Sequence, residues 1–214
     1  MNITPLVARQ VFIMLILIIV GFVLAKKNLV SEKGAADMSN VLLTIVTPCV
    51  LIQAYQIECD AAIMHDIGLA FLLSIVLHAL FIPIAYIVFM REKNADRKKI
   101  NIFTSVYSNC GFMGIPLLAA TLGEKGVLLG SAYLAMFNII AWTQGLYLYG
   151  GSIKVLSLKN LVKNAGVMGS VIALVLFCGR IRLTGVLDAS VDYIAALNTP
   201  LAMILLGAYL ARTQ

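Results

Sequence analysis

The stretch SNCGFMGIPL, residues 108–117, places two glycines, an asparagine and a proline inside a segment apolar enough to cross a membrane. Proline has no amide hydrogen to donate, and it disfavours helical geometry at the residue before it. Glycine lowers the cost of unwinding and lets another backbone approach closely. The stretch therefore predicts that a spanning helix breaks here into two half-helices, with the carbonyl of Phe112 left without its usual donor.

The composition around this stretch is that of an integral membrane protein. Of the 214 residues, 61% are hydrophobic and only 12% are charged. A helix needs about 20 mostly apolar residues to cross a hydrocarbon layer about 30 Å thick. The sequence predicts an all-α integral membrane protein with about seven transmembrane helices. The segments are residues 5–25, 38–57, 66–90, 100–120, 127–149, 165–178 and 192–211.

The positive charges indicate the orientation of these spans. The net charge is +6, but the basic residues lie beside the spans rather than on one soluble face, which argues against a nucleic-acid partner. Most of them follow the first, third, fifth and seventh spans, among them Lys26, Lys27, Arg91, Lys93, Lys154, Lys159, Lys163 and Arg212. The positive-inside rule then predicts that the N-terminus lies outside and the C-terminus in the cytoplasm. We expect the membrane to be the plasma membrane.

The sequence offers no sign of an enzyme. It contains no His-Glu-x-x-His zinc motif, no Gly-x-Ser-x-Gly elbow and no phosphate-binding loop. Its four cysteines share no metal-ligand spacing. We therefore expect no enzymatic activity, no metal and no cofactor, and the sequence leaves the coupling ion open.

The predicted break offers groups that suit an anionic ligand. Backbone groups freed by a proline in a span must face protein or water, because lipid cannot bond to them. The N-terminus of a half-helix presents amides and a positive dipole end, and Asn109 beside it can both donate and accept. The alternative is a packing kink without further function, because glycine and proline are common in membrane helices.

Three further polar residues lie within spans. Gln53 follows the Pro48 kink, and Asn138 is, after Asn109, the second candidate for a residue that lines the cavity. For Asn138 a purely structural role, an interhelical hydrogen bond of about 0.6 kcal/mol, has the same weight as a role in the cavity. His78 lies deep in the third span, where it is either functional or bonded to a neighbouring helix, and it is left outside the predicted site.

Three motifs carry a resemblance to a known family. They are Asn-x-Gly-Phe-Met-Gly-Ile-Pro at residues 109–116, NVLLTIVTPCVLIQAY at 40–55 and PLAMILLGAYLA at 200–211. The last two also echo each other, because Thr47 and Pro48 match Thr199 and Pro200. With these motifs the sequence resembles the auxin efflux carrier family, in particular its bacterial malate permease-like members.

The resemblance implies a permease, a secondary transporter that moves small organic anions by an elevator-like motion. It implies ten helices in two inverted five-helix repeats, with broken crossover helices at the substrate site. Residues 1–150 would form the first repeat and residues 151–214 the start of the second. The expected substrate-binding residues are Asn109, Gly111, Gly114, Pro116, Pro48, Gln53 and Asn138, with Asn198 and Pro200 as the second-repeat kink.

Part of the family pattern, including the second crossover helix, would lie beyond Gln214. The alternative function is therefore a truncated, non-transporting membrane component or subunit that needs a partner chain. The expected partners are a small carboxylate substrate and the lipid bilayer, and a homodimer is a candidate assembly.

Overall fold

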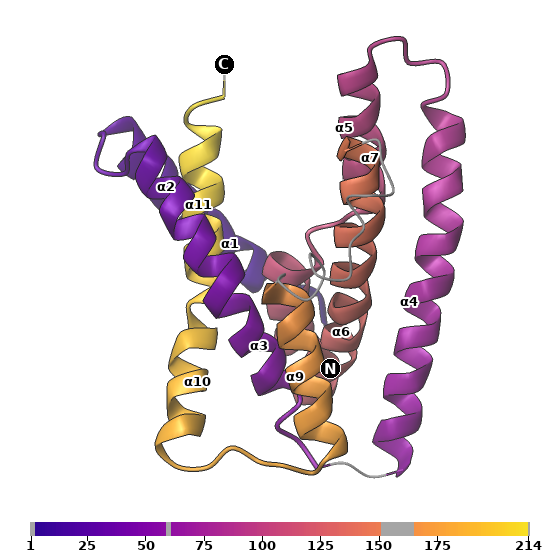
Figure 1. The fold of residues 1–214 in the computed structure, drawn as a ribbon. Helices are drawn as coiled ribbons and strands as arrows, with labels where there is room; N and C mark the ends of the chain where they lie inside the picture. Colours follow the sequence, from indigo (N-terminus) through magenta and orange to yellow (C-terminus); the bar gives the residue numbers. More distant parts are fainter. Residues whose placement is uncertain (1–2, 59–60, 151–164, 214) are drawn as a thin grey trace.

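The computed structural model describes residues 3–58, 61–150 and 165–213, in which every regular element is a helix (Figure 1). The α-helices are α1 (Ile3–Lys26), α2 (Glu32–Val41), α3 (Thr47–Ala54), α4 (Ala61–Val88), α5 (Ala95–Val106), α6 (Ile115–Ile140), α7 (Leu146–Gly150), α9 (Ala165–Cys178), α10 (Val186–Ala196) and α11 (Asn198–Leu210). Three π-helical turns join some of them, namely η1 (Leu42–Val46), η2 (Cys110–Gly114) and η3 (Ala141–Gly145). The predicted all-α membrane fold is confirmed.

The helices of the described residues include five segments long and apolar enough to cross a membrane, and α9 is a shorter apolar helix. One of the five, residues 95–150, is interrupted twice. Its chain is not helical at residues 107–109, and Gly123 in α6 has a φ of 64°, which turns the helix. The count of seven spans stays a prediction. So does the division at residue 150, because residues 151–164 lie outside the described residues.

Helices α1 and α11 pack closely against each other, because a glycine on each helix leaves room for the backbone of the other. A Cβ on Gly207 would overlap the carbonyl oxygen of Ile18, and a Cβ on Gly21 would overlap that of Ile204. Helices in lipid associate mainly through close packing, which small residues at the contact allow. The two backbones therefore touch directly.

Helices α3 and α9 form a second close pair. A Cβ on Gly169 of α9 would lie 2.6 Å from the Cα of Pro48, so the Pro48 kink packs against α9. Figure 1 shows α1, α2, α10 and α11 on one side of the molecule and α4 to α7 on the other, with α3 and α9 between them. The fold thus consists of a group formed by α1–α3 and α9–α11, and a second group formed by α4–α7.

Most of the described basic loops lie at one end of the molecule, and the α9–α10 loop with Arg180 and Arg182 lies at the other. Figure 1 places the α1–α2 loop, the α4–α5 loop and the C-terminus at the same end. These segments carry Lys26, Lys27, Arg91, Lys93 and Arg212. Lys154, Lys159 and Lys163 lie outside the described residues. Which compartment this end faces stays a prediction.

The glycine contact between α1 and α11 can be tested with an alanine. We expect Gly207→Ala to lower the free energy of unfolding by about 1–3 kcal/mol, because the new methyl group meets a backbone carbonyl that cannot move aside. Gly68→Ala in α4 is the matched control, because a Cβ there meets open space. Thermal unfolding in detergent measures both. Equal transition temperatures for the two variants would contradict the direct contact.

Candidate functional site

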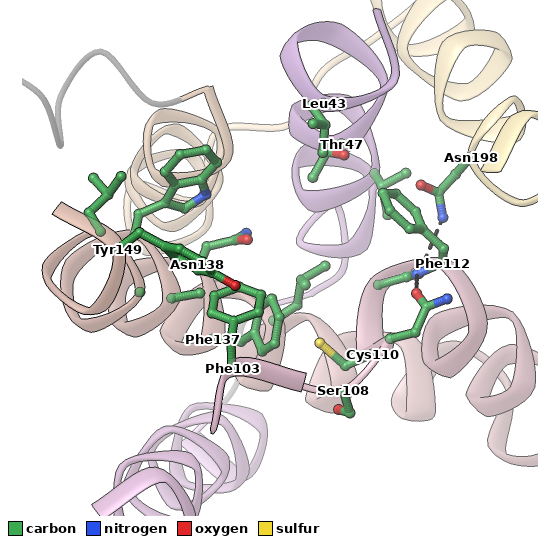
Figure 2. A pocket seen from close by; sticks show the side chains of 18 residues that line it. Leu43, Thr47, Phe103, Ser108, Cys110, Phe112, Phe137, Asn138, Tyr149 and Asn198 are labelled. Carbon is green, nitrogen blue, oxygen red and sulfur yellow. Dashed lines mark hydrogen bonds between the residues drawn. The ribbon is translucent and has the colours of Figure 1, made fainter. Parts of the chain in front are cut away.

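A cavity of about 350 Å³ lies between the two helix groups, and all three π-helical turns contribute to its wall (Figure 2). Leu43 comes from η1, Phe112 from η2 and Trp142 from η3. The remaining lining residues are Thr47, Val50, Phe103, Ser108, Asn109, Cys110, Gly111, Leu134, Phe137, Asn138, Ala141, Gly145, Leu146, Tyr149 and Asn198. Because π-helical turns within α-helices are frequent at functional sites, this convergence makes the cavity the candidate site.

Asn109 builds the break that opens the cavity. Helix α5 ends at Val106, and Tyr107 after it is extended, with φ −100° and ψ 95°. The side-chain oxygen of Asn109 accepts a hydrogen bond from the Phe112 amide at 3.2 Å, and its carbonyl accepts from the amides of Met113 at 3.3 Å and Gly114 at 3.2 Å. This residue therefore caps the second half-helix. Its oxygen is committed to the cap, so its amide nitrogen is the group that a ligand could meet.

The break lies at residues 107–109, ahead of the glycines and the proline expected to form it. The two glycines lie within η2, where the Ile115 amide donates to the carbonyl of Cys110, so the segment that contains them stays helical. The Ile115 amide is used by Cys110 and Pro116 has no amide hydrogen, so neither residue donates to the carbonyl of Gly111. Asn198 replaces them, because its side-chain nitrogen donates to that carbonyl at 3.3 Å. The sequence predicted that the Phe112 carbonyl would lack its usual donor. In the structure, the carbonyl that receives a substitute donor is that of Gly111.

The Pro48 kink is built in the same way. The amide of Thr47 donates to the carbonyl of Leu42 across η1, and the Thr47 hydroxyl donates to the same carbonyl at 2.9 Å. In both helices a π-helical turn is followed by one residue and then the proline. Thr47, the residue between η1 and Pro48, lines the cavity wall.

Asn138 presents an unpaired amide at the cavity. It lines the wall from α6, it is only 8% exposed, and its side-chain nitrogen has no hydrogen-bond partner among the described residues. An unsatisfied buried polar group costs about 1–3 kcal/mol. The described residues thus provide no acceptor for this amide on a neighbouring helix, and a ligand in the cavity would supply one.

Four of the predicted site residues meet at this cavity, namely Asn109, Gly111, Asn138 and Asn198. The others do not line it: Gly114, Pro116, Pro48, Pro200 and Gln53. Gly111 also has a packing role, because a Cβ there would lie 3.3 Å from a methyl carbon of Leu134. The binding role of every predicted residue stays a prediction.

Gln53 lies in a different environment. Its side-chain nitrogen donates to a carboxylate oxygen of Asp192 at 2.7 Å, and it lines a second cavity together with Glu124 and Asp188. This cavity is acidic, whereas the described residues that line the cavity at the break include no Asp, Glu, Lys, Arg or His. The cavity at the break combines apolar walls with a few convergent amides, which is the usual form of a small-molecule site.

The aromatic part of the wall was not foreseen. Phe103, Phe112, Phe137, Trp142 and Tyr149 line the cavity together with the amides, and Figure 2 labels four of these rings, those of Phe103, Phe112, Phe137 and Tyr149. An aromatic residue in a span gives no sequence signal of its own, because such residues also face lipid or the helix core. The one available sign is the position of Trp142, four residues after Asn138 and therefore on the same helical face.

Two comparisons with known proteins bear on this site. Residues 6–156 match the model of the family described as "Membrane transport protein". The chain is also similar to Protein ECM3 of Saccharomyces cerevisiae, with 26% identity over 147 residues, which covers 64% of this chain and 24% of the yeast protein. The chain therefore spans about a quarter of the length of this relative.

Asn138 and Asn198 give a matched pair of substitutions. We expect Asn138→Leu to raise the free energy of unfolding by about 1 kcal/mol, because it removes an unpaired buried amide. Asn198→Leu should lower it by a similar amount, because the Gly111 carbonyl then loses its donor. Thermal unfolding of the purified chain in detergent measures both changes. Destabilisation by Asn138→Leu would show that the Asn138 amide has a partner in the protein.

Proposed function

This chain belongs to the membrane transport protein family, and from that premise we propose that it is a secondary carrier for small organic anions, carboxylates above all. The substrate binds in the cavity at the helix break. This proposal favours a carrier over an enzyme, and it places the protein in the plasma membrane. The activity of the whole carrier, including its substrate, is part of the proposal.

The observation that carries the proposal is the meeting of three side-chain amides in a cavity wall whose described residues carry no charge. Asn109 and Asn138 offer nitrogen donors, and Asn198 holds the neighbouring backbone in place. Neutral donors can stabilise an anion without binding it so tightly that release becomes slow. A single carboxylate also loses less hydration on entering an apolar cavity than a doubly charged phosphate does.

Helix pairing supports the inverted repeat. If α9 to α11 repeat α1 to α3 with opposite orientation, then α1 corresponds to α9 and α3 corresponds to α11. A twofold axis would relate the pair α1 and α11 to the pair α9 and α3. Both pairs pack through glycines, at Gly21 and Gly207 in one and at Gly169 in the other. Inverted repeats of this kind are common in secondary transporters.

The cavity also suits an elevator-like motion. Its wall combines Leu43, Thr47 and Asn198 from the α1–α3 and α9–α11 group with Asn109 and Asn138 from the α4–α7 group. We propose that the α4–α7 group moves with the substrate against the other group. Such a motion would separate the two walls and open the site.

Counterflow of labelled carboxylates in liposomes tests the proposal. Asn109→Ser keeps an oxygen that can cap the half-helix but removes the amide donor, so we expect uptake to fall at least about tenfold while folding is retained. Asn101→Ser on α5 is the matched control outside the cavity wall, and it should transport at the unaltered rate.

Two results would contradict the proposal. One is full uptake by folded Asn109→Ser, which would remove Asn109 from the site. The other is the absence of uptake by the folded, unaltered chain for every carboxylate tested, which would favour a component that needs a partner chain.

A further inference from the structure

The His78 ring is buried beside the cavity with one nitrogen unpaired. It is 2% exposed in α4, and its Nδ1 lies 2.7 Å from the carbonyl oxygen of Ser74. A carbonyl can only accept, so Nδ1 carries the hydrogen and Nε2 holds the lone pair. This Nε2 is buried and has no partner among the described residues. His78 therefore offers a basic nitrogen that the folded chain does not use.

Aromatic rings separate His78 from the cavity. The centroid of its ring lies 5.5 Å from that of Tyr133, 6.0 Å from that of Tyr107 and 6.2 Å from that of Phe137. Phe137 lines the cavity, and Tyr107 lies two residues before Asn109. One layer of side chains thus lies between the imidazole and a ligand in the cavity.

Among the described residues, the titratable groups whose rings face His78 do not supply a negative charge. One of these groups is Tyr107 at the break, whose hydroxyl donates to the side chain of Gln144 at 2.7 Å. The other is Tyr133 of α6, which lies close to the Cys110 thiol of η2. Phenols and thiols are neutral near pH 7. A charged imidazole here would lack a nearby anion until a carboxylate occupies the cavity.

We propose that Nε2 of His78 is the proton-binding site that couples carboxylate transport to a proton. This inference rests on the proposed function. The lone pair of Nε2 forms a bond to a proton taken from water on the side from which the carboxylate enters. The bond breaks after the carboxylate leaves, and the proton passes to water on the other side. Nothing is oxidised or reduced.

The coupling must work in both directions. A bound carboxylate stabilises the charged imidazole, so by linkage a protonated imidazole tightens carboxylate binding by the same factor. Charges separated by one side-chain layer in a protein interior interact strongly enough for an effect of about tenfold. We therefore expect carboxylate uptake to rise about tenfold between pH 8 and pH 6, for a monocarboxylate that is fully ionised over this range.

Direct observation of the ring is feasible because the chain has only two histidines. His65 lies near the start of α4 with an exposed side chain, so His65→Gln leaves His78 as the single imidazole signal in nitrogen NMR. At pH 6 we expect added monocarboxylate to increase the doubly protonated fraction of His78, and the matching neutral amide to leave it unchanged. Equal fractions with and without carboxylate would overturn the inference.

Uptake measurements separate this inference from the proposed function. His78→Asn retains a nitrogen that can donate to the Ser74 carbonyl but cannot take up a proton. We expect its uptake to be flat between pH 8 and pH 6, whereas His65→Asn should follow the unaltered chain. Uptake by His78→Asn with the same pH dependence as the unaltered chain would overturn the coupling and leave the carrier standing. Absence of uptake in all three folded chains would overturn both.

Discussion

The structure depends on the need to satisfy every backbone polar group where water is absent. A helix can end inside a membrane only if protein or an enclosed cavity takes over its free amides and carbonyls. Asn109 meets this need by accepting from three amides of the next half-helix. Asn198 meets it for the Gly111 carbonyl. These bonds allow α5 to stop at Val106, and the cavity lies where it stops.

The same constraint explains why amides lie in the otherwise apolar wall of the site, whose described residues carry no formal charge. Pro48 and Pro116 are each preceded by a π-helical turn, which changes the register of the backbone hydrogen bonds. The Gly111 carbonyl is paired by the Asn198 amide from another helix, and the Leu42 carbonyl is paired by the Thr47 hydroxyl of its own helix. In the cavity wall the Asn138 amide nitrogen remains unpaired among the described residues. The pairing groups come from both helix groups, so relative movement of the groups would change the site itself. A carrier needs this property, because its site must bind on one side and release on the other.

The sequence predicted the architecture better than the contacts. The apolar composition and the length of the apolar segments identified the all-α membrane fold, and the glycines and proline of residues 108–117 placed the break to within a few residues. Two features were out of reach. Sequence patterns do not reveal a π register, so the break was expected after Asn109 rather than before it. Nor do they reveal partners distant in the chain, such as Asn198 on Gly111 or Asp192 on Gln53. The Asn138 amide was foreseen as a cavity residue, but only the packed helices show that it is unpaired.

Trp142 allows the most direct measurement of the central claim, which is that a small carboxylate binds at the helix break. It is the only tryptophan of the chain, it lines the cavity, and it is 38% exposed. Its fluorescence should change saturably as a monocarboxylate is added to the purified protein, and the matching neutral amide should produce no such change. Emission that stays constant for every carboxylate, from a chain shown to be folded, would contradict the account.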